Sequence, residues 1–142
     1  MVDFAQTIAP SNVGLRSLAP TYTQPDLAAG ADLAETAIAI VPQDMKIQRI
    51  RIVPRGVSAG VDSGNTSVWT VRAGVAGTTI GVLTRTTDFA ANTAYELTLT
   101  AAAQPVAAGT ILTLQVTNGA TADTDVTMVF VEGNSFGPSP IS

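Results

Sequence analysis

The sequence predicts an all-β protein: a β-sandwich or jelly-roll-like domain of about seven or eight antiparallel strands with an extended N-terminal arm. From about residue 33 onward, β-branched and apolar residues alternate with polar ones, which is typical of half-buried strands. Turn-forming residues separate these runs at the roughly 8 to 15 residue spacing of sandwiches. With 142 residues, the chain has the length of one domain.

We predict three segments: an arm over residues 1–31, the sandwich over 32–132 and an extended tail over 133–142. The arm contains three prolines, and its apolar residues follow no sustained period. An alternative for the Ala-rich stretch 26–37 is a short helix capped by Asp26. The tail is too rich in Pro and Gly to continue a sheet.

Seven runs carry the strand pattern: 35–41, 46–53, 67–73, 79–84, 95–100, 110–117 and 126–132. In the first run, Ile38 and Ile40 have the same parity and are expected on one face. In the second, Ile47 is out of phase with Ile50, which predicts a β-bulge near Gln48. The spacing and number of these runs favour a sandwich over any helical architecture.

A long Gly-containing loop is predicted over residues 55–65, and it leads into the run 67–73. It does not match a phosphate-binding loop, because it lacks the required lysine and precedes a strand rather than a helix. Within that strand, Trp69 lies among alternating β-branched residues, so we expect it in the core.

Composition excludes several classes of function. The chain has no Cys and no His, which removes disulfides, thiolate or imidazole metal sites and imidazole-based catalysis. Its net charge of -4 argues against nucleic-acid binding. We expect neither a secretion signal nor a membrane span, and we expect synthesis in the cytoplasm. Because only 13% of residues are charged, the sheet edges are expected to be covered by partners.

Three kinds of site were weighed and none is favoured. Paired carboxylates from Glu35, Glu96 and Glu132 could serve a glycosidase, but the chain offers few aromatics for a sugar cleft, so we expect no enzyme activity. No cofactor and no metal site are expected. Oxygen ligands for Ca²⁺ occur at 62–65 and 123–125, where turn capping is the preferred interpretation.

The arginines at 49, 51 and 55 share one parity and form a strip along one strand and the loop that follows it. We expect this strip to be solvated or to face a partner, and an anion site is the alternative.

The runs Ile80–Thr100 (IGVLTRTTDFAANTAYELTLT) and Val106–Thr117 (VAAGTILTLQVT) carry a resemblance to a known family. With their turn-strand pattern, residues 32–132 resemble the sandwich of head decoration (cement) proteins of tailed bacteriophages. The resemblance implies a virion protein on the outer surface of the capsid. It would form a homotrimer, bind the major capsid protein and stabilise contacts between capsomers. No residue roles carry over individually.

The apolar residues of the arm are the candidate partner interface under this hypothesis: Phe4, Ile8, Leu15, Leu18 and Tyr22. They would reach the capsid or the next subunit. A carbohydrate- or receptor-binding module of a phage fibre or tail is the alternative function, and it requires an exposed aromatic platform. A tail-tube or minor capsid subunit is a third hypothesis, which predicts polymers or rings rather than a small closed oligomer.

Overall fold

The protein is an all-β sandwich, as predicted. The computed structural model describes residues 20–100 and 104–135, and these residues form nine strands and no helix. The strands are β1 (Tyr22–Gln24), β2 (Leu33–Ile40), β3 (Met45–Pro54), β4 (Ser67–Ala73), β5 (Thr78–Arg85), β6 (Tyr95–Glu96), β7 (Thr98–Leu99), β8 (Ile111–Asn118) and β9 (Thr127–Ser135).

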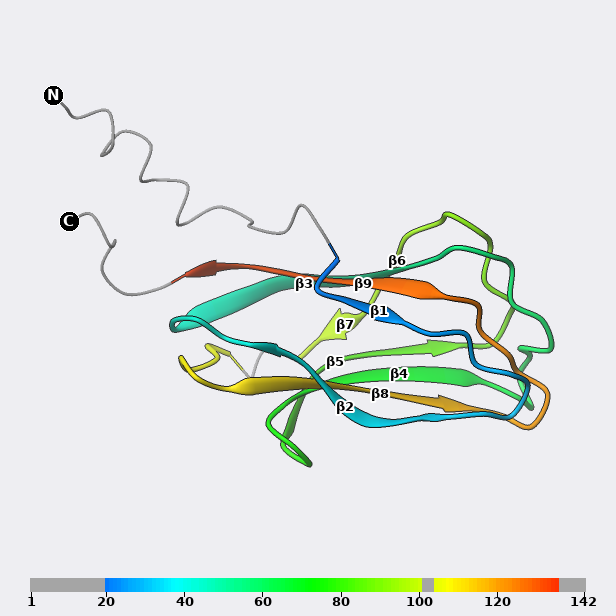
Figure 1. The fold of residues 1–142 in the computed structure, drawn as a ribbon, viewed down its shortest axis with the longest axis horizontal. Coiled ribbons are helices and arrows are strands. Elements are labelled where there is room, and N and C mark those ends of the chain that lie inside the picture. The colour runs from blue at the N-terminus through cyan, green and yellow to red at the C-terminus, as the bar shows by residue number, and fades with distance from the viewer. Residues whose placement is uncertain (1–19, 101–103, 136–142) are drawn as a thin grey trace, which may run out of the picture.

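Two antiparallel sheets face each other (Figure 1). One sheet has four strands in the order β1-β9-β3-β6, and the other has five in the order β2-β8-β4-β5-β7. The predicted run 95–100 divides between them: β6 pairs with β3 and β7 pairs with β5. A short stretch of chain therefore joins the two sheets along one side of the sandwich.

The predicted bulge in β3 is confirmed. The pairing of β3 with β9 shifts between Ile47 and Arg49, so that Ile47, Ile50 and Ile52 all face inward and are buried.

The expected pairing of Ile38 and Ile40 on one face is wrong. Strand β2 shifts register against β8 between Leu33 and Thr36 and again between Ala37 and Ala39. The second shift leaves Ile38 packed against the core and turns Ile40 outward, opposite Ile111. An insertion of one residue reverses the side-chain alternation beyond it.

The core lies between the sheets and is confirmed to contain Trp69, which is 0% exposed. Its ring packs edge-on against Phe89 with the ring centroids 6.2 Å apart, and Phe89 packs in the same way against Tyr95. The indole N–H of Trp69 donates to the Ser67 hydroxyl at 3.0 Å. Arg85 closes this cluster, with its guanidinium carbon 4.5 Å from the centre of the Tyr95 ring.

The connecting loops divide between the two ends of the sandwich. Loops 25–32, 55–66, 86–94 and 119–126 meet at one end, which we call the loop end, and hydrogen bonds join them, such as Gly30 N–H to Ala122 C=O and Asp123 N–H to Ala59 C=O. At the opposite end, which we call the terminal end, lie the turns 41–44 and 74–77 and the segment 104–110. Strand β9 also finishes there, whereas β1 runs from the middle of β9 towards the loop end (Figure 1).

The described part of the predicted arm belongs to the sandwich. Residues 22–24 form β1 on β9, Leu27 pairs with Thr124, and β2 has begun by Leu33. The alternative helix over 26–37 is therefore wrong, because hydrogen bonding to the 119–126 loop holds this segment extended or in a turn. Strand β9 likewise continues to Ser135, beyond the predicted start of the tail at 133.

Candidate interaction surface

Of the five predicted interface residues, the structure describes Tyr22, while Phe4, Ile8, Leu15 and Leu18 lie outside the described residues. Tyr22 lies on β1 opposite Val129 and packs, half-buried, against the core of its own chain. Its ring therefore contributes to the sandwich rather than reaching outward as an anchor.

Of the candidate calcium ligands, Asp62 caps its own turn, as predicted, whereas Asp123 bonds to another loop. The Asp62 carboxylate accepts hydrogen bonds from the backbone N–H groups of Gly64 and Asn65, and these bonds lower its pKa from the usual value. The Asp123 carboxylate accepts from Ala59 N–H. Among residues 20–100 and 104–135, no three acidic side chains gather where they could hold a metal ion.

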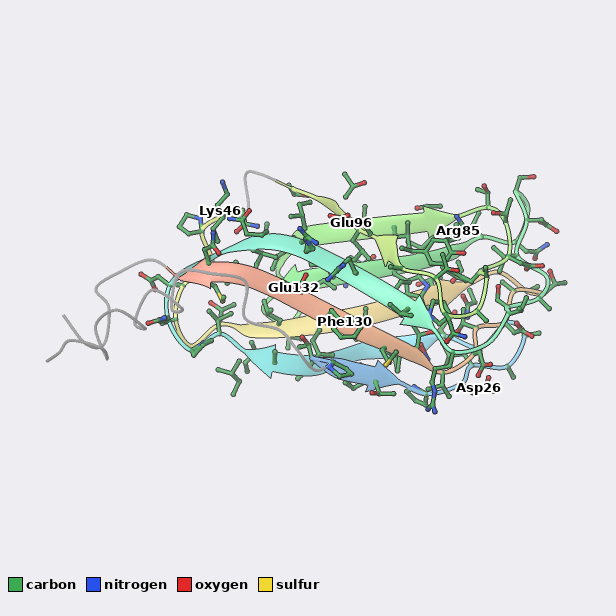
Figure 2. The ribbon with its side chains drawn as sticks, turned by 90° about the horizontal axis from the view of Figure 1, so that it is seen from above. Asp26, Lys46, Arg85, Glu96, Phe130 and Glu132 are labelled. Carbon is green, nitrogen blue, oxygen red and sulfur yellow. The ribbon has the colours of Figure 1, made fainter. Side chains whose placement is uncertain are left out.

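Of the predicted arginine strip, Arg49 and Arg51 lie on the outer face of the four-stranded sheet, where Glu132 also lies (Figure 2). Arg51 donates to both carboxylate oxygens of Glu132, at 2.9 and 3.0 Å, and Arg49 is 3.7 Å from the same carboxylate. Glu132 is only 6% exposed, and its carboxylate pairs with these arginines. It therefore takes the place that an external anion would fill. Arg55 is separate and lies exposed in the 55–66 loop.

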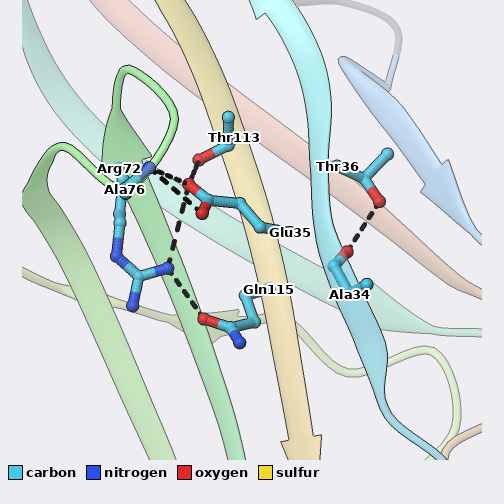
Figure 3. Close-up of polar contacts among 7 residues, drawn as sticks. All are labelled: Ala34, Glu35, Thr36, Arg72, Ala76, Thr113 and Gln115. Carbon is cyan, nitrogen blue, oxygen red and sulfur yellow. Dashed lines mark hydrogen bonds and ion pairs between the residues drawn. The ribbon is translucent and has the colours of Figure 1, made fainter.

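Glu35 joins three elements across the outer face of the five-stranded sheet (Figure 3). Its carboxylate accepts from the Thr113 hydroxyl at 2.6 Å and from Ala76 N–H at 3.0 Å, and lies 3.9 Å from the Arg72 guanidinium. These contacts, the Thr113 bond first, lower the pKa of Glu35. A carboxylate held ionised in this way is poorly suited to donate a proton to a glycosidic oxygen.

An aromatic platform for sugars is missing from the described residues. Trp69 and Phe89 are buried, and Tyr22 and Tyr95 are half-buried and packed against the core. Phe130 is half-buried on the outer face of the four-stranded sheet, next to Arg51 (Figure 2). The carbohydrate-binding alternative depends on flat exposed rings, and the described aromatic side chains do not supply a group of them.

The net charge of the chain lies entirely at the loop end. Its four loops contain six aspartates (26, 32, 62, 88, 123 and 125) and Arg55, and Arg85 ends β5 beside them, which together account for the net charge of -4. Asp26 and Arg85 mark this end in Figure 2, and Lys46 marks the other. Elsewhere in the sequence, acidic and basic residues are equal in number. The molecule therefore has an acidic end and an electrically neutral one.

Exposed aliphatic side chains gather at the neutral, terminal end. Ile40 is 67% exposed, and its strand partner Ile111 is 40% exposed. The C=O of Ile111 accepts from Gly74 N–H at 2.7 Å, which brings the adjacent Val75, 72% exposed, to the same corner. We call these three residues the aliphatic corner. Sequence reasoning missed it, because it depends on the β2 bulge and on the pairing of strands distant in sequence.

Comparison with known proteins adds no assignment. No protein-family model matches the chain, and a search of curated proteins found no relative. No helix that could cross a membrane occurs within residues 20–100 and 104–135.

Proposed function

We propose that this chain is a structural protein of a phage virion, which decorates the outer surface of the head as a small homo-oligomer and stabilises contacts between capsomers. The observation that carries the proposal is the polarity of the sandwich. The aliphatic corner and the end of β9 at Ser135 share the neutral end, and the acidic loops lie at the other. We propose that the neutral end faces the partner.

Desolvation gives the physical reason for this orientation. Three exposed aliphatic side chains at one corner gain roughly 25 cal/mol for each Å² of apolar surface that a partner covers. The acid of β2, Glu35, already has hydrogen-bond partners and an arginine, so covering the corner leaves this carboxylate paired. Docking through the loop end would instead bury aspartates against a surface of unknown charge.

The N-terminal segment extends the proposed interface. Nineteen residues precede Pro20, among them Phe4, Ile8, Leu15 and Leu18. A fully extended chain of that length spans about 60 Å, enough to reach a neighbouring capsomer or subunit. Several such contacts on one oligomer would bind far more tightly than one contact alone.

The test uses undecorated heads assembled from the major capsid protein of the same virus. The double variant Ile40→Lys/Ile111→Lys should leave the fold intact and reduce co-sedimentation with these heads at least tenfold. Val57→Lys is the matched control, because Val57 is 68% exposed but lies in a loop-end segment. Full occupancy by the double variant, or equal loss with Val57→Lys, would contradict the proposed orientation. Failure of the unmodified protein to bind any heads would refute the function itself.

A further inference from the structure

Two strand edges of the sandwich are blocked. The edge strand β2 has two register shifts, and the Thr36 hydroxyl donates to the Ala34 C=O, so this edge does not offer a regular ladder. Such irregular edges are poor templates for another strand.

The edge of β3 on the β6 side is closed along its length. Strand β6 pairs with Arg51 and Ile52, and Leu97 N–H donates to Ile50 C=O. Next to these, the Gln104 side-chain amide replaces a strand: its oxygen accepts from Ile47 N–H at 2.9 Å and its nitrogen donates to Ile47 C=O at 3.3 Å. Val106 pairs with Met45 and closes the end.

The outer edge of β9 differs from all of these. Strand β1 pairs with it only from Thr127 to Val129, and Thr21 ends this pairing by accepting the Val131 N–H with its side-chain hydroxyl. Pro20, the residue before it, has no N–H to donate. Beyond Val131, no described strand pairs with this edge of β9.

This stretch of β9 is nevertheless held as a strand, although its pairing with β3 shifts between Glu132 and Gly133, opposite the bulge in β3. On its other side, β9 pairs with β3 as far as Ser135. Because Val129 C=O and Val131 N–H point towards β1, the alternation of an antiparallel strand directs the N–H and C=O groups of Gly133 and Ser135 to the same open side.

Charge does not protect this edge either. The acid within it, Glu132, is paired with Arg51 on β3 and is buried. Edge strands that remain solvated usually carry an exposed charge, a proline or a bulge to prevent pairing with another chain. From Val131 to Ser135, β9 has no proline and no exposed charge, and the extra residue of the bulge in this ladder lies on β3.

We propose that residues 2–8 of a second copy of this chain add to the β9 edge from Val131 to Ser135 as a further strand. In this segment Val2, Phe4 and Ile8 share one parity, so a strand would present them together on one face. Backbone hydrogen bonds would supply affinity, and these side chains would supply specificity. The 11 residues between Ile8 and Pro20 reach about 36 Å when extended, which is enough to cross to an adjacent subunit.

This inference rests on the self-association in the proposed function, but it does not need a capsid. The added strand comes from another copy of the chain, so the N-terminal segments are exchanged between copies. The described pairing of the chain's own N-terminal side with β9 ends at Thr21.

Disulfide trapping tests the proposal cleanly because the chain has no cysteine of its own. Two single variants, Thr7→Cys and Asn134→Cys, are mixed, allowed to exchange subunits and oxidised. We expect a covalent two-chain product, and we expect the double variant in one chain to give linked oligomers rather than monomers. Thr7→Cys mixed with Val57→Cys is the control, because Val57 lies in a loop-end segment; this mixture should give at least tenfold less product.

The solution mass of the same samples separates the two hypotheses. A monomeric protein would refute self-association and with it the proposed function. An oligomer in which the double variant forms only a link within one chain would overturn strand exchange alone. An oligomer that gives no more product than the Val57→Cys control would do the same.

Discussion

The hydrogen bond between Ser67 and Trp69 gives the sharpest test of the described core. Both residues are 0% exposed, and the indole N–H has the Ser67 hydroxyl as its partner at 3.0 Å. Ser67→Ala removes this acceptor and leaves a buried N–H without a partner. The free energy of unfolding should fall by about 1–3 kcal/mol, the usual penalty for an unsatisfied buried polar group.

A double-mutant cycle isolates that contribution from general packing effects. Trp69→Phe removes the donor together with part of the ring, and it should itself destabilise the protein by opening a cavity. In that background the additional Ser67→Ala change should be neutral or slightly stabilising, because no indole N–H remains. The predicted coupling between the two changes is therefore about 1–3 kcal/mol.

The measurement is urea unfolding followed by far-ultraviolet circular dichroism, since fluorescence is lost when Trp69 is replaced. All four proteins must be compared at one concentration, because self-association adds a concentration-dependent term to stability. If Ser67→Ala costs the same in both backgrounds, to within about 0.5 kcal/mol, the hydrogen bond is not the source of the effect and the reasoning is refuted.

Three further predictions concern the surface contacts. Folding lowers the pKa of Glu35 below 4.5, so the stability contributed by its ionised carboxylate is complete above that pH and is lost as the pH falls through the folded-state pKa. Unfolding titrations should therefore show wild type more stable than Glu35→Gln at pH 7. This difference should vanish in acid. Gly60→Ala should destabilise the protein by about 1–3 kcal/mol or more in thermal unfolding, because Gly60 has φ +71° and an added Cβ would lie 2.0 Å from the Thr121 carbonyl oxygen; an unchanged melting temperature would contradict this contact. Gln104→Ala removes both hydrogen bonds to Ile47 and should lower the free energy of unfolding in urea by about 1–3 kcal/mol. Gln104→Glu should recover only the bond from the Ile47 N–H. Equal stability of Gln104→Ala and wild type would show that the amide does not close the β3 edge.

The parts of the fold that were predictable are those in which one face is buried and the alternation is strong. In β3, the large isoleucines mark the inward positions, so a break in their parity at Ile47 reveals the bulge. In β2, alanines occupy many positions on both faces, and the parity of Ile38 and Ile40 gives no sign of the two register shifts. Small side chains specify register weakly, which is why that prediction was wrong.

Short elements and distant pairings were not predictable. Strand β1 has three residues, too few to show a period, and its partner β9 begins 103 positions after Gln24. The aliphatic corner depends likewise on Gly74 bonding to Ile111 across a long sequence separation. The acidic end could have been recognised in advance, because its aspartates all fall in predicted turns or in the Pro-rich segment before the first predicted strand.

The distribution of charge also bears on which kind of assembly this chain can form. Contact between two loop ends would oppose four net negative charges on each side, and it would be disfavoured at distances within the roughly 8 Å screening length of physiological salt. A head-to-tail stack would place the acidic end against a neutral one, which offers no compensating positive charge. The contacts left are those through the neutral end and the sides of the sandwich. The charge distribution therefore agrees with the proposed contacts, which use the neutral end and the β9 edge rather than the acidic loops.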